Sequence, residues 1–518
     1  MLTTRTKYFA TLSKQYQKMY HPEFQQEVDD HESEEQEHDP EIYYDEKGNI
    51  LVQKEEIIDP ILREANIGWR NHPGVPDVLI DNIREIARQH NVKRINEKFD
   101  TMEEQRLEFS LQELDSSLWF RKEGLTPDET KELSKTKKSK PNEYGPEESL
   151  AYTVRRTIPI YTVLSRVFAE VSRRMGPTFQ PASVLDYGAG PGTVVWSADT
   201  VWPNNVSFKN GQFTLIDNSQ AMKELSSSIL ISEDMLEDTR TNPTNSMNEW
   251  EMGPNIRWRT SLRDLMEDPN ATVNNNTKND KKNDKNDTAN TTNTNTALST
   301  RLLPHHQHDI VLASNMISEL PKDKSRDATI ELLWRLTAPG GVLIIVERGN
   351  RWGSSVAARA RQLILELDPK VAQIVAPCTH SQSCPMIEKS KKQKSWCHFA
   401  HRTGDEDIRK IVGNRSPQHR PSYDKFSYIV IQKKTKNQQK KHHDRDNKWD
   451  FNVPWGRIIK PPLRRGKHVI VDVCGNDGLL QRKTFGKRRH KEGGVYRAAR
   501  RSEWGALWGK DKVVLQKE

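Results

Sequence analysis

The chain contains few cysteines and no long hydrophobic stretch. Only four of its 518 residues are cysteine, too few for a secreted protein of this length held together by disulfides. No uninterrupted apolar stretch approaches the roughly 20 residues that a membrane-spanning helix needs, so we expect no integral membrane protein. The length is sufficient for two to four domains with a buried core, although only 34% of the residues are hydrophobic.

Charge is distributed unevenly along the chain, although the formal net charge is only +8. Residues 351–518 hold 38 Lys or Arg and 16 Asp or Glu, a balance of +22. Residues 1–350 hold 42 and 56, a balance of −14. This asymmetry predicts a polyanionic partner for the C-terminal third.

The N-terminal 59 residues have the composition of targeting and linker sequence. Residues 1–22 are amphipathic, with four Lys or Arg and no acid, which predicts an organellar transit peptide. An ordinary basic N-terminus is the alternative. We interpret residues 23–59 as an acidic linker, because twelve acids and no Lys or Arg fall between Glu23 and Glu46.

Residues 60–176 show helical periodicity. From Asp77 to His90, apolar residues recur at intervals of three and four and form one stripe. Leu150 to Met175 is a longer amphipathic run, in which Pro159 predicts an interruption. We expect a helical region packed ahead of a second domain.

Between residues 177 and 370, short apolar runs alternate with helix-forming segments. Four of these runs have the composition of buried strands: Ser183–Asp186, Phe213–Asp217, Asp309–Ala313 and Gly341–Glu347. The alternation predicts a parallel, doubly wound sheet and hence an α/β fold with a Rossmann-like domain. Residues 271–300 contain nine Asn and almost no large aliphatic residue, which predicts a disordered insert.

A glycine-rich loop follows the first predicted strand, which ends at Asp186. Gly188, Gly190 and Gly192 have the spacing G-x-G-x-G, which allows a ligand to approach the backbone closely. The spacing fits S-adenosylmethionine better than NAD, since S-adenosylmethionine has no pyrophosphate. Asp217, at the end of the second strand, is placed to accept hydrogen bonds from the ribose hydroxyls, while Asp186 either orders the loop or binds the amino group. A glycine turn kept only for packing is the alternative.

The third predicted strand ends in the sequence Ala-Ser-Asn-Met-Ile-Ser-Glu-Leu. In many methyltransferases this edge carries the group that positions the methyl acceptor or removes its proton. Asn315 and Glu319 are the candidates here. Glu319 also fits as a helix-start charge, so the sequence supports cofactor binding better than turnover.

The four cysteines could form one four-thiolate site. They are spaced C-x5-C-x12-C with one far downstream: Cys378, Cys384, Cys397 and Cys474. A [4Fe-4S] cluster fits this set better than structural zinc, which usually uses a shorter Cys-Cys spacing. Three histidines keep a mixed-ligand zinc site open: His380, His398 and His401. Four unrelated reduced thiols remain the simplest alternative.

The C-terminal tail combines cations with aromatic residues. Residues 481–510 carry ten Lys or Arg and two Glu, and residues 433–441 add a second basic cluster. Four aromatic residues are interleaved: Phe485, Tyr496, Trp504 and Trp508. Cations that bind phosphates together with aromatics that stack on bases predict RNA contact. A solvated charged face is the alternative.

Several of these motifs together resemble one known family, the methyltransferase-like proteins of the mitochondrial small ribosomal subunit. The similar segments are Leu185–Gly192, Pro377–His380 with Cys384–Pro385, Trp396–Phe399, Trp455–Leu463 and Asp472–Cys474. The resemblance covers residues 60–508 apart from the Asn-rich insert. It does not extend to the acidic N-terminal stretch.

The resemblance implies an S-adenosylmethionine-type pocket. Together with the patterns above, we expect an S-adenosylmethionine-dependent methyltransferase fold with a helical N-terminal region and a cysteine-rich, basic C-terminal region at 371–518. It also implies a [4Fe-4S] cluster on the four cysteines and a role in the mitochondrial matrix. There the protein would help to build or complete the small ribosomal subunit, in contact with its rRNA and ribosomal proteins. An active rRNA methyltransferase is the first alternative, and an iron or redox sensor of assembly is the second.

Overall fold

The computed structural model describes residues 43–44, 50–51, 74–117, 143–206, 210–230, 255–265, 307–386, 396–403, 411, 422–436, 438, 455–490 and 495–509. The predicted transit peptide, most of the acidic linker and the Asn-rich insert therefore lie outside the described residues. So does part of the second basic cluster. Strands β1 (Tyr43–Tyr44) and β2 (Ile50–Leu51) form an isolated antiparallel pair.

Within the described part of the N-terminal region, the structure has three helices. They are α3 (Asp77–Arg88), α4 (Val92–Ser116) and α6 (Pro146–Met175). The apolar stripe predicted for α3 is buried, with Leu79 and Ile83 fully inside. The interruption predicted at Pro159 is wrong, because α6 continues through this residue. Side chains are buried nearly all around α6, and this packing outweighs the one backbone hydrogen bond that a proline removes.

An eight-stranded sheet forms the centre of the molecule. Its strands are β3 (Ser183–Tyr187), β4 (Gln212–Ile216), β5 (Ile256–Arg259), β6 (His308–Ser314), β7 (Thr337–Arg348), β8 (Ala372–Ala376), β9 (Phe399–Thr403) and β10 (Ser422–Lys433). The order is β5-β4-β3-β6-β7-β10-β8, with β9 paired to the first half of β10. Strands β3 to β7 pair in parallel, whereas β10 runs antiparallel to both of its neighbours.

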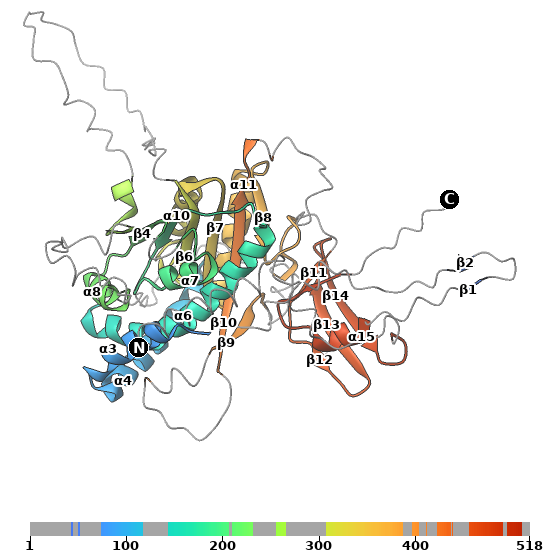
Figure 1. Ribbon diagram of the computed structural model, residues 1–518, viewed down its shortest axis with the longest axis horizontal. Helices are drawn as coiled ribbons and strands as arrows, with labels where there is room; N and C mark the ends of the chain where they lie inside the picture. The colour runs from blue at the N-terminus through green and yellow to red at the C-terminus, as the bar shows by residue number, and fades with distance from the viewer. Residues whose placement is uncertain are drawn as a thin grey trace, which may run out of the picture.

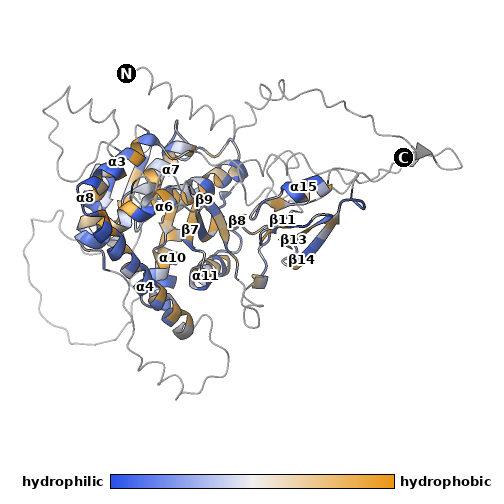
Figure 2. Ribbon diagram, turned by 90° about the horizontal axis from the view of Figure 1, so that it is seen from below, coloured by the Kyte–Doolittle hydropathy of each residue, from blue (hydrophilic) through white to orange (hydrophobic). Residues whose placement is uncertain are grey.

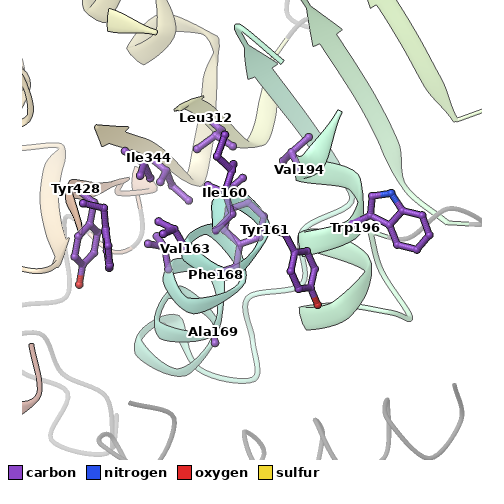
Figure 3. Close-up of a cluster of buried hydrophobic side chains, with 14 of the residues drawn as sticks. Ile160, Tyr161, Val163, Phe168, Ala169, Val194, Trp196, Leu312, Ile344 and Tyr428 are labelled. Carbon is purple, nitrogen blue, oxygen red and sulfur yellow. The ribbon is translucent and has the colours of Figure 1, made fainter. Parts of the chain in front are cut away.

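Helices cover both faces of this sheet (Figure 1). Helices α6, α7 (Thr193–Val201) and α8 (Gln220–Ile229) lie on one face, and α10 (Asp323–Leu336) and α11 (Arg351–Leu367) lie on the other. Alternate strand residues enter the two cores, as Leu312 and Val311 do. Figure 3 shows Ile160 and Val163 of α6 beside Leu312 and Ile344 in the first core.

A smaller antiparallel sheet follows. Its strands are β11 (Gly456–Ile458), β12 (Leu463–Arg464), β13 (His468–Cys474), β14 (Leu480–Gly486) and β15 (Leu507–Trp508). Helix α15 (Val495–Arg501) packs on it through Val495 and Ala499. Figures 1 and 2 show this unit beside the larger sheet.

The doubly wound α/β fold is confirmed, with two differences from the sequence prediction. The expected domain boundary at residue 370 falls inside the large sheet, because β8, β9 and β10 complete it. Strand β5 was not predicted, since only Ile256 and Trp258 in its four residues are buried. Among the described residues, no helix is long and apolar enough to span a bilayer.

Candidate cofactor loop and cysteine junction

The glycine loop, residues 188–192, follows β3 at the carboxyl end of the parallel strands. Gly188, Gly190 and Gly192 have φ angles of +78°, +52° and +76°, a region in which a residue with a Cβ is strained. The backbone N–H groups of Gly188 and Ala189 donate to the carbonyl oxygen of Ile216 at 2.8 and 3.0 Å. Strand β4 therefore fixes the loop directly.

Two carboxyl groups lie beside this loop. Oδ2 of Asp217 accepts a hydrogen bond from the Gly190 N–H at 2.9 Å, and Oδ1 accepts one from the Ser219 N–H at 2.9 Å. Asp186 is only 3% exposed, and burial together with the charge of Asp217 raises its pKa to about 8. The predicted cofactor residues are thus brought together, but Asp217 already binds the loop.

Side chains also pack onto the glycines. A Cβ built on Gly188 would lie 2.8 Å from Cγ of Met316, and one on Gly192 would lie 2.8 Å from Cδ1 of Leu230. A Cβ on Gly190 would meet nothing closer than a ring carbon of Tyr152, at 3.8 Å. Two glycines are therefore required by internal packing, and Gly190 is the position with space for a ligand.

The end of β6 leads into a small polar pocket. Asn315 has a φ of +55°, and its N–H donates to the carbonyl oxygen of Val346 at 2.7 Å. Glu347 is fully buried, accepts from the Ser318 N–H at 3.0 Å, and has its pKa raised by burial to about 7. The pocket is lined by Arg156, Ile160, Val163, Ser314, Asn315, Val346, Glu347, Asp424, Lys425 and Phe426. Glu347 was not predicted as a site residue, because in the sequence it is the last residue of an apolar strand.

Glu319 is held in a buried ion-pair network. Its Oε1 accepts from Arg106 Nε and Nη2 at 3.0 and 2.8 Å and from the Tyr144 hydroxyl at 3.2 Å. Arg106 also contacts Glu103, which pairs with Arg348 through a 2.7 Å bond. These contacts join α4 to the edge of the sheet. Glu319 is therefore engaged by a permanent cation, unlike a free general base.

The four cysteines lie where the two sheets meet. Two follow β8, one precedes β9 and one ends β13: Cys378, Cys384, Cys397 and Cys474. We call this place the cysteine junction. Hydroxyl groups of Ser354 and Ser427 donate to the carbonyl oxygen of Cys397 at 2.7 and 2.9 Å. The thiols thus come from chain segments that are far apart in sequence, and none is in a disulfide.

The thiols of the junction affect one another's ionisation. Burial and the thiols of Cys384, Cys378 and Cys474 together raise the pKa of Cys397. Burial followed by Cys378 and Cys384 raises the pKa of Cys474. Within the described residues, no three His, Cys, Asp or Glu side chains are close enough to hold a single metal ion. The junction is therefore a set of thiols that repel one another when they ionise.

Two buried arginines hold the backbone around these thiols. Arg457 of β11 donates from Nε to the Pro377 carbonyl oxygen at 2.7 Å, beside Cys378. Nη2 of Arg361 in α11 donates to the carbonyl oxygens of His380 and Gln382 at 2.8 and 2.6 Å. The arginines are 1% and 2% exposed. Neither residue was predicted as part of the site, although Arg457 lies in a segment that carried the family resemblance.

Of the three candidate histidines, His380 contacts a cysteine. Its Nε2 lies 3.4 Å from Sγ of Cys474. His398 instead places its ring 4.8 Å from that of Trp504, and its Nδ1 contacts the Trp396 carbonyl oxygen at 3.1 Å. His401 lies in β9, paired with Asp424 of β10. The arrangement therefore favours a thiolate site over one with several imidazole ligands.

Exposed cations lie at one end of the small sheet and on α15. They lie in the β12–β13 turn, after β14 and on α15: Arg464, Arg465, Lys467, Lys487, Arg488, Arg489, Arg497, Arg500 and Arg501. We call this surface the basic face. Backbone and side-chain bonds join its parts, including Lys487 N to Lys467 O at 2.8 Å and Arg464 Nε to Arg500 O at 2.7 Å. Figure 2 shows α15 as a hydrophilic helix on the small sheet.

The aromatic residues of the tail do not all reach this surface. Phe485 and Trp508 are 3% and 4% exposed, and their rings pack 5.0 Å apart in the core of the small sheet. The expectation that they stack on bases is wrong, because a sheet of this size needs them for its own core. Tyr496 and Trp504 are partly buried.

Strand order and site together define the class of fold. Numbered along the chain without β9, the strands of the large sheet have the order 3-2-1-4-5-7-6, with the seventh antiparallel. With a glycine loop after the first strand and an acid after the second, this is the Rossmann-like fold of S-adenosylmethionine-dependent methyltransferases. The chain belongs to the family described as mitochondrial small ribosomal subunit Rsm22, whose profile matches residues 146–252 and 255–509.

Relatives carry names consistent with this family. The human "Ribosome assembly protein METTL17, mitochondrial" is 26% identical over 365 residues, which cover 69% of this chain and 62% of the human protein. "Ribosome assembly protein RSM22, mitochondrial" of Saccharomyces cerevisiae is 22% identical over 430 residues, covering 67% and 65%. The chain thus spans less than two thirds of the length of these two relatives.

Solved methyltransferase structures are more distant. A putative class I S-adenosylmethionine-dependent methyltransferase from Listeria monocytogenes is 11% identical, with a TM-score of 0.28, covering 67% of this chain and 90% of its own. The N-methyltransferase NodS from Bradyrhizobium japonicum, in complex with S-adenosyl-L-homocysteine, is 9% identical, covers 53% of this chain and 86% of its own, and has a TM-score of 0.24. Scores this low add nothing to the strand order as support for the fold.

Proposed function

We propose that this protein is a mitochondrial assembly factor or component of the small ribosomal subunit that is required for mitochondrial translation. It binds small-subunit rRNA through the basic face and carries a [4Fe-4S] cluster at the cysteine junction. Membership of the family and the names of the relatives support the assembly role. The observation that carries the proposal is the meeting of four thiols between the methyltransferase-like sheet and the basic small sheet.

The donor set fits a cluster better than a zinc ion. Structural zinc sites usually include a pair of cysteines with about two to four residues between them, whereas the spacings here are C-x5-C and C-x12-C. A cubane takes one thiolate on each of its four irons, and the chain has four cysteines. A cluster on Cys378, Cys384, Cys397 and Cys474 would tie the loop after β8 to the last residue of β13.

The basic face fits a nucleic acid backbone. Its cations are all exposed and come from three segments that hydrogen bonds join to one another. Such a surface binds phosphate groups with release of counterions, so its affinity depends steeply on salt. Because the face belongs to the same small sheet as Cys474, a cluster at the junction would fix its orientation relative to the larger domain.

Active rRNA methylation is the second candidate function, and the glycine loop with Asp217 favours it. Bound S-adenosylmethionine would supply a methyl group. Gly190 leaves space beside the loop, and Asp217 and the loop backbone would hold the ribose. Against turnover, the Glu319 carboxylate is paired with Arg106 and accepts a hydrogen bond from the Tyr144 hydroxyl. We therefore propose that the domain acts in assembly mainly as a binding module.

Purification and sedimentation test the proposal. Protein isolated without oxygen should contain about four iron and four sulfide per chain and should sediment with small subunits. Stoichiometric zinc without iron would contradict the cluster. In cells, Asp217→Ala separates the two functions: lost methylation with assembled subunits favours the enzyme, and lost subunits with unchanged methylation favour the assembly factor.

A charge-reversal pair tests the basic face. Arg488→Glu with Arg489→Glu should weaken binding to small-subunit rRNA and lower the salt slope by about one for each phosphate that these arginines neutralise. Lys322→Glu with Lys324→Glu changes the charge equally at exposed positions near the start of α10 and should leave binding unchanged. Equal weakening in both variants would indicate nonspecific attraction and contradict an RNA site on the basic face.

A further inference from the structure

Arg457 joins three separate parts of the molecule through its guanidinium group. Its Nε donates to the Pro377 carbonyl oxygen at 2.7 Å, its Nη1 to Gly505 O at 2.7 Å, and its Nη2 to Oε1 of Glu170 at 2.6 Å. Pro377 precedes Cys378, Gly505 precedes β15, and Glu170 lies in α6. One side chain thus connects the cysteine loop, the small sheet and the central helix.

Glu170, the ion-pair partner of Arg457, is also held by hydrogen bonding. Oε2 of Glu170 accepts a 2.6 Å hydrogen bond from the Tyr428 hydroxyl. Burial alone would raise the pKa of Glu170, but the guanidinium groups of Arg457 and Arg166 lower it to about 2. Both Arg457 and Glu170 are therefore charged inside the protein, where an ion pair is costly unless its geometry is well satisfied.

The positive charge of the buried arginines also bears on the proposed cluster. A [4Fe-4S] cluster bound by four thiolates has an excess of negative charge, which increases by one on reduction. Arg457 donates to the carbonyl oxygen of Pro377, next to Cys378. Arg361 donates to the carbonyl oxygen of His380, whose ring contacts Sγ of Cys474. Two buried cations therefore lie beside the loop that would carry the cluster.

We propose that Arg457 is a positioning residue for the cluster: it fixes the loop that carries Cys378, offsets the charge of the thiolates and links the cluster to α6 through Glu170. Arg361 supports the same loop from α11 through His380 and Gln382. This inference rests on the proposed cluster and assigns a function to residues outside its ligand set.

Two substitutions separate geometry from charge. Arg457→Lys keeps the cation but cannot make the three hydrogen bonds of the guanidinium. The variant should therefore lose iron and sulfide ~10-fold faster than the wild type. This is the lower end of the effect of mutating residues that support metal ligands. Glu170→Gln keeps the shape but removes a negative charge. Its cluster should be easier to reduce, with a higher reduction potential, because Arg457 is then no longer neutralised.

The control is Arg482→Lys, which alters a bidentate pair with Asp472 on the exposed side of the small sheet. It should retain the cluster and its potential. Thermal unfolding and circular dichroism identify variants that fail to fold. If Arg457→Lys is among them, the potential of Glu170→Gln still decides the question, since a purely structural role predicts no shift.

The outcomes distinguish this inference from the proposed function. A wild-type protein without iron and sulfide overturns the cluster, and the role of Arg457 with it. A wild-type cluster that Arg457→Lys retains equally well, with an unchanged potential in Glu170→Gln, overturns the inference alone. Faster cluster loss in the first variant and a raised potential in the second support it.

Discussion

The glycine loop and the cysteine junction differ in how far the protein satisfies its own polar groups. At the glycine loop, Asp217 binds two backbone N–H groups and Met316 packs onto Gly188. At the cysteine junction, burial and the neighbouring thiols raise the pKa of Cys397 and Cys474, and two guanidinium groups bond to the backbone nearby. The first site satisfies its own polar groups without a ligand, whereas the thiols of the second would ionise only if a bound metal stabilised the thiolates.

This difference suggests which ligand the fold depends on. A site that is complete without its ligand tolerates the loss of that ligand. A site whose ligand would bond to thiolates from both sheets does not, since ligand binding there would contribute directly to the stability of the junction. We therefore expect the cysteine junction to matter more than the glycine loop for structure and for assembly.

Loss of a thiol at the junction should have the largest effect. Cys474→Ser removes the one candidate ligand from the small sheet, and we expect loss of nearly all iron and of sedimentation with small subunits. Iron analysis and sucrose gradients measure both. Met386→Leu is the control, because Met386 packs in the same cluster as Cys474 without a thiol. If an iron-free Cys474→Ser protein still associated fully with small subunits, the cysteine junction would matter less for assembly than the glycine loop.

Glu319→Gln tests the polar edge near the glycine loop. The substitution removes one of the two carboxylates that pair with the buried guanidinium of Arg106, and Glu103 remains. The cost should therefore be below the about 3–5 kcal/mol of a fully broken buried pair. We expect a lower free energy of unfolding in urea, with Glu224→Gln on the exposed side of α8 unchanged. Normal stability combined with lost rRNA methylation would instead identify Glu319 as catalytic.

Sequence patterns predicted the elements better than their boundaries. Four apolar runs gave four strands, because each is buried on both faces. The domain boundary predicted at residue 370 is too early, because β10, which completes the sheet, begins only at Ser422. Continuity of α6 through Pro159 depends on tertiary packing, which periodicity does not report.

The residues of the two sites were also only partly predictable from the sequence. The sequence identified the four cysteines because cysteine is rare in this chain. It identified Asp217 because this acid stands at the end of a predicted strand. Spacing did not identify Arg457 or Arg361, because arginine is usually exposed and its burial depends on partners far away in the chain. The network that holds Glu319 was missed for the same reason: Arg106 lies 213 positions earlier.

Glu347→Gln should change how stability depends on pH. Burial raises the folded-state pKa of Glu347 from 4.5 to about 7, so its favourable contribution is complete below about pH 4.5 and is lost as the pH rises through 7. The shift corresponds to roughly 3 kcal/mol. The melting temperature of the variant minus that of the wild type should therefore be larger at pH 8 than at pH 5.

Asp100→Asn, an exposed substitution on α4, is the control for that pH series and should follow the wild type. A constant difference between Glu347→Gln and the wild type at all pH values would mean that Glu347 is already ionised in the folded protein. It would then be a charged group in the pocket beside Asn315.

Among alanine substitutions in the glycine loop, Gly190→Ala should give the smallest effect. All three glycines have positive φ, so each alanine costs about 1–2 kcal/mol. Gly188→Ala and Gly192→Ala also collide with Met316 and Leu230, which adds roughly 1–3 kcal/mol. We therefore expect Gly190→Ala to be the most stable of the three variants in urea unfolding.

The ranking of these variants bears on the purpose of the loop. If the glycines serve packing alone, Gly190→Ala should lose only about 1–2 kcal/mol, the cost of its positive φ, because its Cβ meets nothing closer than Tyr152 at 3.8 Å, and it should match the wild type in binding and assembly assays. If the loop binds S-adenosylmethionine, the same variant should lose affinity in calorimetry while remaining folded, since the new methyl group occupies the space that the ligand needs. Equal destabilisation of all three variants would show that space around the loop does not distinguish Gly190, and the case for a ligand there would depend on Asp217 alone.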